Sequence, residues 1–404
     1  MNRLINLDPS LEVALVGGAL ALLAAIGVAW RGRRAGRRGW PAWQRVFTVA
    51  TLFLTLDLVV FGAFTRLTDS GLGCPDWPGC YGETSPFAAH ADIVRAHAAQ
   101  PTGPVSPAKA WIEMTHRYLA TGVGALITGL MLAGWRYRRV AGGLSPWWAT
   151  LTFVWVCAQG AFGALTVTLK LQPIVVSAHL LGAMLGVALL TAQVRVLSPR
   201  DATVTPAWRT APLRRWGMAL LALIVIQIAL GAWVSTNYAV LACQDLPTCQ
   251  GQWWPAMDFE TAFRLLRPLG QDGQGAFISL TALTAIHLTH RLMAVPVALA
   301  VLLYGRALQR WRGGGLRTAP WQREGRILWG LLAWQLLSGL SNVILGWPLL
   351  AALAHTLGAT LLVGWLVRLL VLPQATDTQA MATQGVSSPR HQGLHATAPA
   401  RAAP

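Results

Sequence analysis

The sequence predicts an all-α polytopic membrane protein, built from two pseudo-symmetric four-helix transmembrane bundles and one additional N-terminal transmembrane helix. Three observations predict this fold. The chain of 404 residues is 54% hydrophobic and only 12% charged, which is fewer charges than a soluble domain of this size carries. Apolar runs of about 20 residues, enough for a helix to cross the hydrocarbon core, recur along the chain. Several short motifs also occur twice, in the same order.

The apolar runs predict nine transmembrane helices. In chain order they cover roughly 11–30, 46–66, 111–134, 147–169, 174–194, 216–236, 277–304, 327–345 and 349–371. The first run could be mistaken for a signal peptide. Its positive cluster follows the apolar stretch instead of preceding it, so we expect a retained helix.

The formal net charge of +17 reflects membrane topology and does not indicate a nucleic-acid partner. The basic residues gather in every second connection between the spans: RGRRAGRRGWPAWQR, RYRR, 195–215 and 305–326. By the positive-inside rule these connections are cytoplasmic. We therefore expect a multi-pass protein of the bacterial plasma (inner) membrane, with the N-terminus and the alternate loops on the outer (periplasmic) face and the C-terminus in the cytoplasm.

Two seven-residue motifs, CPDWPGC (Cys74 to Cys80) and CQDLPTC (Cys243 to Cys249), share the pattern C-x-D-x-P-x-C and are each followed by a glycine two residues later. Further motifs around them match in order: Gly62-Ala63-Phe64 with Gly231-Ala232-Trp233, His116-Arg117 with His290-Arg291, Gln159 with Gln335, and His179 with His355. This order predicts an internal duplication of a four-helix unit, arranged as parallel repeats.

The predicted duplication divides the chain into four parts. Residues 1–43 form the extra N-terminal transmembrane helix and a basic cytoplasmic loop, and residues 44–200 form the N-terminal four-helix half. Residues 208–372 form the C-terminal half. Residues 373–404 are polar, rich in Ala, Thr, Ser and Pro, and predict a disordered cytoplasmic tail.

Four histidines lie inside predicted spans at matched positions of the two halves: His116, His179, His290 and His355. Ionisable residues are costly within a membrane and usually functional. Two histidines on separate helices of a bundle can bind a haem iron from both sides. We therefore predict one haem site in each half, both in the outer leaflet. Interhelical hydrogen bonding is the simpler alternative, and zinc is disfavoured because two histidines are too few ligands.

Glu113 precedes His116 by three residues and lies on the same helical face, whereas the second half has His287 at that position. A carboxylate beside a haem could accept or donate protons. The alternative is an acidic residue near a helix start, favoured by the helix dipole. His287 could face the second haem or form a hydrogen bond at the helix mouth.

Arg117 and Arg291 directly follow the first histidine of each half. Each could pair with haem propionates through its guanidinium fork or extend toward the lipid headgroups. Asp57, near the middle of a span, could belong to a proton path or to a polar helix contact, and the sequence does not decide between them.

The cysteine motifs are expected on the outer face, which is oxidising. Two cysteines six residues apart, with a proline turn between them, can close a small loop. We therefore predict disulfides Cys74–Cys80 and Cys243–Cys249. A redox-active pair that exchanges thiols during function is the alternative.

Taken together, GAFTRLTDSGLGCPDWPGCYGE, EMTHR, the four span histidines and the second cysteine loop resemble the haem A synthase family, over about residues 44–372. The resemblance implies that the methyl group of haem O is oxidised to a formyl group, giving haem A for cytochrome oxidase. It implies that His116 and His179 bind the substrate haem O and that His290 and His355 bind a haem b cofactor. Glu113 matches the family's acidic residue before the first histidine and is the expected catalytic residue.

Iron with two axial histidines has no open position for O₂, which favours water as the oxygen source. The expected route is successive hydroxylation, with electrons leaving through haem b. The resemblance implies haem O synthase (protohaem farnesyltransferase) as the substrate donor and cytochrome oxidase assembly as the product acceptor, and leaves open whether the chain forms a homo-oligomer. The alternatives are a di-haem electron-transfer cytochrome b and a haem carrier without ring chemistry.

Overall fold

The computed structural model describes residues 5–6, 9–198, 212–311 and 319–371. The predicted tail at 373–404 lies outside these residues, as do parts of two basic connections. The regular secondary structure of the described residues is helical apart from two strands of two residues each.

Nine helices of the described chain are long and apolar enough to cross a membrane, which confirms the predicted polytopic, all-α fold class. They are α1 (Ser10–Arg34), α2 (Trp40–Leu67), α4 (Pro107–Arg136), α5 (Pro146–Thr168), α6 (Pro173–Val196), α8 (Pro212–Thr236), α10 (Leu280–Arg310), α11 (Ala319–Ile344) and α12 (Leu349–Leu370).

Local sequence explains where several of these helices begin. Proline stands in the first turn of α2, α4, α5 and α6, where its missing N–H costs nothing. The two helices that carry His-Arg also have serine caps. Ser106 accepts the N–H of Lys109 at 3.3 Å before α4, and Ser279 accepts that of Ala282 at 3.2 Å before α10.

Some helix boundaries differ from the predicted ones, because a helix can continue through polar turns that lie outside the apolar run. Helix α11 begins at Ala319, before the span predicted from residue 327, since WQREGR continues the helix beyond the apolar run. Three short helices were not predicted, because none is long enough to form an apolar run of membrane-spanning length: α3 (His90–Ala99), η1 (Ala239–Ala242) and α9 (Phe259–Ala262).

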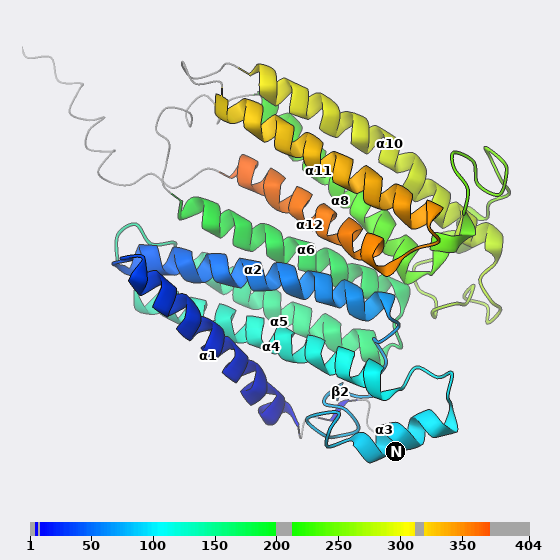
Figure 1. The fold of residues 1–404 in the computed structure, drawn as a ribbon, viewed down its shortest axis with the longest axis horizontal. Helices are drawn as coiled ribbons and strands as arrows, with labels where there is room; N and C mark the ends of the chain where they lie inside the picture. The colour runs from blue at the N-terminus through cyan, green and yellow to red at the C-terminus, as the bar shows by residue number, and fades with distance from the viewer. Residues whose placement is uncertain (1–4, 7–8, 199–211, 312–318, 372–404) are drawn as a thin grey trace, which may run out of the picture.

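The spanning helices after α1 form two groups of four (Figure 1). In the first group α2 packs against α4 and α6, and α5 packs against the same two helices. In the second group α10 packs against α8 and α11, and α12 packs against the same two. The helices of each group therefore close a ring, in which α4 lies diagonally opposite α6 and α10 diagonally opposite α12. The two groups therefore share one ring arrangement, and the duplication itself stays a prediction.

The two rings meet along four helices. Helix α6 packs against α8 and α12, and α2 packs against α12. A buried contact on this seam joins Ser177 of α6 to Thr236 of α8, with 3.0 Å between the hydroxyl oxygens. Thr360 of α12 donates to the Met184 sulfur of α6 at 3.5 Å.

Helix α1 lies against the first ring only, along α4 (Figure 1). Gly17 permits the close approach, because a Cβ at that position would lie 2.5 Å from the Thr121 side chain. Just before the helix, β1 (Ile5–Asn6) pairs in parallel with β2 (Trp77–Pro78), which lies inside the first cysteine loop. The additional helix is thus attached to the first half at both places.

Candidate functional site

A cavity of about 1990 Å³ extends through both rings. Pockets for a single small ligand usually measure roughly 300–1,000 Å³, so this cavity has room for more than one large ligand. All four span histidines line it. Both cysteine loops border it as well, through Trp77 and Pro78 in the first loop and Leu246 and Pro247 in the second.

The histidines of each half come from diagonally opposite helices of one ring. His116 lies on α4 and His179 on α6, whereas His290 lies on α10 and His355 on α12. Each histidine lies in the N-terminal half of its helix. Side chains on opposite helices of a bundle can approach one planar ligand from its two faces. The predicted pairing within each half is therefore compatible with the fold.

Each span histidine packs beside a glycine of a neighbouring helix: Gly62 beside His116, Gly163 beside His179, Gly231 beside His290, and Gly339 beside His355. A Cβ at Gly62 would lie 3.0 Å from His116 Nε2, and one at Gly231 would lie 2.9 Å from His290 Cε1. Both distances are shorter than ordinary packing contacts. The repeated Gly-Ala-aromatic motif therefore keeps space for an imidazole ring in each half.

The two halves differ in the hydrogen bonds that their histidine rings make. In the second half the Gln227 amide nitrogen lies 3.1 Å from His290 Nδ1, and the Ser338 hydroxyl lies 3.0 Å from His355 Nδ1. Among the described residues, no hydrogen bond reaches the ring of His116 or His179. The Nδ1 atom of His179 is buried without a partner.

Glu113 and Arg117 form a buried ion pair beneath the first cysteine loop. Their side chains are 5% and 8% exposed, and 2.5 Å separates the carboxylate from the guanidinium. Glu113 also accepts the Cys74 N–H at 2.7 Å. Arg117 donates to the backbone carbonyls of Asp76, Pro78 and Gly79. The pair therefore fastens the loop to α4, while Glu113 also lines the cavity.

The second half repeats this clamp with a histidine in place of the carboxylate. His287 Nε2 accepts from Arg291 Nε at 3.2 Å. Arg291 also donates to the carbonyls of Cys243, Asp245 and Thr248. In both halves the guanidinium is thus directed at the cysteine loop, and the propionate role predicted for Arg117 and Arg291 stays a prediction.

The two cysteine loops are closed by disulfides, as predicted: Cys74 with Cys80 and Cys243 with Cys249. The spacing that the two motifs share has a structural reason. Asp76 accepts the N–H groups of Tyr81 and Gly82 at 2.6 and 2.7 Å. Asp245 accepts those of Gln250 and Gly251 at 2.7 and 2.9 Å.

The glycine that follows each motif occupies a left-handed backbone conformation, with φ of 78° at Gly82 and 73° at Gly251. Glycine adopts this conformation without steric cost, which explains its presence in both loops. Hydrogen bonds from the Thr248 hydroxyl and from the Gly251 and Gln250 N–H groups lower the pKa of Asp245 to about 2.

We expect Asp245→Ala to open the second loop, because the N–H groups of Gln250 and Gly251 lose their acceptor. The rate at which tris(2-carboxyethyl)phosphine reduces Cys243–Cys249, followed by mass-tag labelling, should rise several-fold. Asp92→Ala is the control, because Asp92 lies on α3, in the connection that contains the first cysteine loop, and its carboxylate pairs with exposed Arg95.

The same loop should respond to acid. The pKa of Asp245 is lowered from 3.8 to about 2. The stabilisation that its carboxylate gives to the loop is therefore complete above pH 3.8 and is lost as the pH falls through about 2. An unchanged reduction rate in Asp245→Ala would contradict this role.

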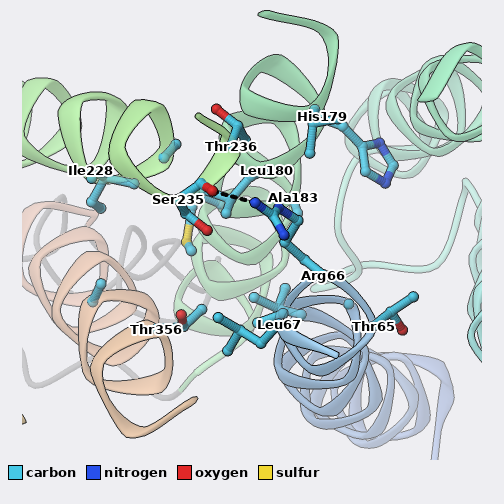
Figure 2. Close-up of a pocket in the computed structure, with 18 of the residues that line it drawn as sticks. Thr65, Arg66, Leu67, His179, Leu180, Ala183, Ile228, Ser235, Thr236 and Thr356 are labelled. Carbon is cyan, nitrogen blue, oxygen red and sulfur yellow. Dashed lines mark hydrogen bonds between the residues drawn. The ribbon is translucent and has the colours of Figure 1, made fainter. Parts of the chain in front are cut away.

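Arg66, at the end of α2, joins the two halves beside the cavity. Its guanidinium donates to the Ser235 carbonyl, lies 3.3 Å from the Asp69 carboxylate and stacks 4.0 Å from the Tyr238 ring centroid. Figure 2 shows it reaching Ser235 between the helix that carries His179 and the one that carries Thr356. The sequence analysis identified the motif that contains Arg66, but it did not predict the contact of Arg66 with the second half.

Asp57, the acidic residue near the middle of α2, is exposed and lies outside the cavity lining. It forms no hydrogen bond or ion pair with any residue that the structure describes. Both predicted roles of Asp57, in a proton path or in a polar helix contact, stay predictions.

Comparisons with known proteins identify the family of the chain. Residues 45–367 match the family described as cytochrome oxidase assembly protein. The protein named heme A synthase from Shewanella oneidensis is 37% identical over 321 residues, which cover 78% of this chain and 92% of that protein. The heme A synthase of Rhizorhabdus wittichii is 28% identical, covering 78% of this chain and 89% of the relative. That of Allorhizobium ampelinum is 27% identical, covering 80% and 88%.

Proposed function

The chain belongs to the cytochrome oxidase assembly protein family, and from this membership we propose that it is a haem A synthase that acts on haem O. The observation that carries the proposal is the pair of histidines from diagonal helices in each ring, both pairs lining one cavity. Relatives of similar length bear the name heme A synthase. Nine apolar helices place the reaction in a membrane.

The residues of the cavity suit two haem groups. A haem is large, flat and apolar, and the glycines beside His116 and His290 leave room for imidazoles next to such a group. We propose that His116 and His179 bind the substrate haem O, and that His290 and His355 hold a haem b cofactor. When bound, haem b would accept electrons one at a time.

The proposed reaction converts one methyl group and one water into one formyl group, with release of four protons and four electrons. The electrons would pass through haem b to an acceptor outside the chain. The protons need an acceptor near the first pair of histidines. Glu113 lines the cavity there, and each of its carboxylate oxygens has a further lone pair besides the bond to Cys74 or Arg117.

The proposed topology places both cysteine loops on the outer face and the C-terminus in the cytoplasm, following the distribution of basic residues. The loops border the cavity on the side of the histidines. A haem O synthase is the proposed substrate donor, and cytochrome oxidase assembly is the proposed destination of the product.

The test is chromatography of haems extracted from membranes that contain a haem O synthase with or without this chain. We expect haem A, or its hydroxylated precursor, only when the chain is present. Two bound haems b with unchanged haem O, in the presence of an electron acceptor, would favour the electron-transfer cytochrome. Haem O bound by the first half and released unaltered would favour the carrier.

A further inference from the structure

We infer that Gln227 and Ser338 are positioning residues that make the second half a site of firm haem retention, whereas the first half, which lacks them, is built for exchange. The inference rests on the proposed function for its assignment of cofactor and substrate. The structural difference between the halves stands apart from that assignment: both histidines of the second half are hydrogen-bonded at Nδ1, and neither histidine of the first half is.

The direction of the hydrogen bond between Ser338 and His355 follows from the other bond of the Ser338 hydroxyl. The hydroxyl donates to the Trp334 carbonyl at 2.8 Å, so its oxygen is available to accept the Nδ1 hydrogen of His355 at 3.0 Å. Hydrogen on Nδ1 leaves the lone pair of Nε2 for a metal. A bond of this kind fixes the tautomer and the orientation of a metal-binding histidine and raises its basicity. Ser338 is itself buried.

Gln227 lies against the other histidine of the second half, on the neighbouring helix α8. Its amide nitrogen is 3.1 Å from both His290 Nδ1 and the His290 carbonyl, while its amide oxygen is buried without a hydrogen-bond partner. Turning the terminal amide by half a turn brings the oxygen to Nδ1, where it accepts the ring hydrogen in exchange for the bond to the His290 carbonyl. In that orientation the amide oxygen has a partner, and His290 Nε2 is left with a free lone pair.

The first half has apolar residues at both matched positions. Leu58 stands 169 residues before Gln227, the offset that also separates Gly62 from Gly231. Phe162 stands 176 residues before Ser338, the offset that also separates His179 from His355. Neither side chain can accept a hydrogen bond. The buried Nδ1 of His179, which has no partner, is the consequence.

This asymmetry fits the different requirements of the two sites. A cofactor haem must stay through many turnovers, whereas a substrate haem must leave after each one. Loss of a hydrogen bond to a metal-binding residue typically lowers metal affinity by about 10–100-fold. The histidines of the two halves can therefore be identical in type while their haems differ in residence time.

The test is haem transfer from the purified full-length protein to excess apomyoglobin, followed by the Soret absorbance, together with redox titration of the retained haem b. We expect Gln227→Leu and Ser338→Ala each to speed the loss of haem b from the second half by about 10-fold or more. The midpoint potential should rise in both variants, because a less basic imidazole stabilises ferric iron less.

Ser341→Ala is the matched control, because Ser341 lies on the same helix, is half-buried and donates its hydroxyl to the Leu337 carbonyl of its own helix. It should change neither rate nor potential. Phe162→Ser supplies the missing acceptor beside His179 and should slow the loss of haem O from the first half. Because it strengthens retention, this result cannot come from misfolding.

The outcomes separate this inference from the proposed function. Faster haem loss and a raised potential in Gln227→Leu and Ser338→Ala, together with no haem A production by the wild-type protein, would uphold the positioning role and reject the synthase. Normal haem A production, with wild-type haem loss and potential in Gln227→Leu and Ser338→Ala, would reject the positioning role. A wild-type rate in Phe162→Ser would reject it for the first half.

Discussion

Glu113→Ala is expected to abolish haem A formation while the second half keeps its haem b. The substitution removes the proposed proton acceptor, the partner of Arg117 and the acceptor of the Cys74 N–H at once. Breaking a buried ion pair by removing one partner typically costs about 3–5 kcal/mol, because the other charge stays buried. The clamp on the first cysteine loop should therefore loosen. The second loop is held by Arg291 and should be unaffected.

Two measurements check this expectation: haem chromatography of membranes that also contain a haem O synthase, and reduced-minus-oxidised spectra of the purified protein. Glu260→Ala is the matched control. Glu260 forms the same i,i+4 pair with Arg264, but its side chain is 87% exposed, and exposed pairs contribute only about 0–1 kcal/mol. Normal haem A production by Glu113→Ala would contradict the proposed role.

Glu113→Gln keeps one part of the clamp and removes the proton acceptor. The amide oxygen can still accept the Cys74 N–H, but the side chain can no longer take up a proton, and the charge pair with Arg117 is lost. If Glu113→Gln is as inactive as Glu113→Ala while its first disulfide resists reduction like the wild type, proton transfer is the decisive loss. If Glu113→Gln is active where Glu113→Ala is not, the decisive role of Glu113 is to hold the loop.

Nine spans and their order could be predicted from the sequence, because the length of an apolar run is the main condition for crossing a membrane. The two disulfides were also predictable, since both partners of each pair lie within one short motif. Helices α3, η1 and α9 were missed because each is too short to form an apolar run of membrane-spanning length and their packing depends on distant segments.

The candidate histidines could be predicted because each motif is local, but their surroundings could not. Gln227 contacts His290 from another helix, and Ser338 contacts His355 in the same way. Such contacts depend on which helices adjoin in the ring. The one sequence signal for Gln227 is that it lies one helical turn before Gly231, on the same face of α8.

The roles of Arg117 and Glu113 show the same limit. Their spacing of four residues indicates an ion pair on one helical face. It does not indicate the carbonyls of Asp76, Pro78 and Gly79, which reach Arg117 only after the disulfide has folded the loop over α4. The sequence therefore left a propionate role and a lipid-headgroup role open for Arg117, and it gave no sign of this contact within the protein.

Gly62→Val and Gly231→Val are expected to empty different sites, and they test the assignment of the two halves. A branched side chain at Gly231 must displace His290, since even its Cβ would lie 2.9 Å from the ring. Haem b should therefore be lost from the second half, and turnover with it. Overpacking of this kind usually costs about 1–3 kcal/mol in stability, less than loss of the whole fold requires.

Gly62→Val acts in the same way on His116, which its Cβ would approach to 3.0 Å. We expect this variant to keep haem b with a wild-type spectrum and to lose both haem O binding and haem A production. Gly330→Val is the control, because a Cβ at Gly330 on α11 meets no atom within 4 Å. The haem content of each purified variant shows which half binds haem b and which binds haem O. Loss of haem b from Gly62→Val and its retention by Gly231→Val would reverse the two halves, because each glycine adjoins the histidine of its own ring only.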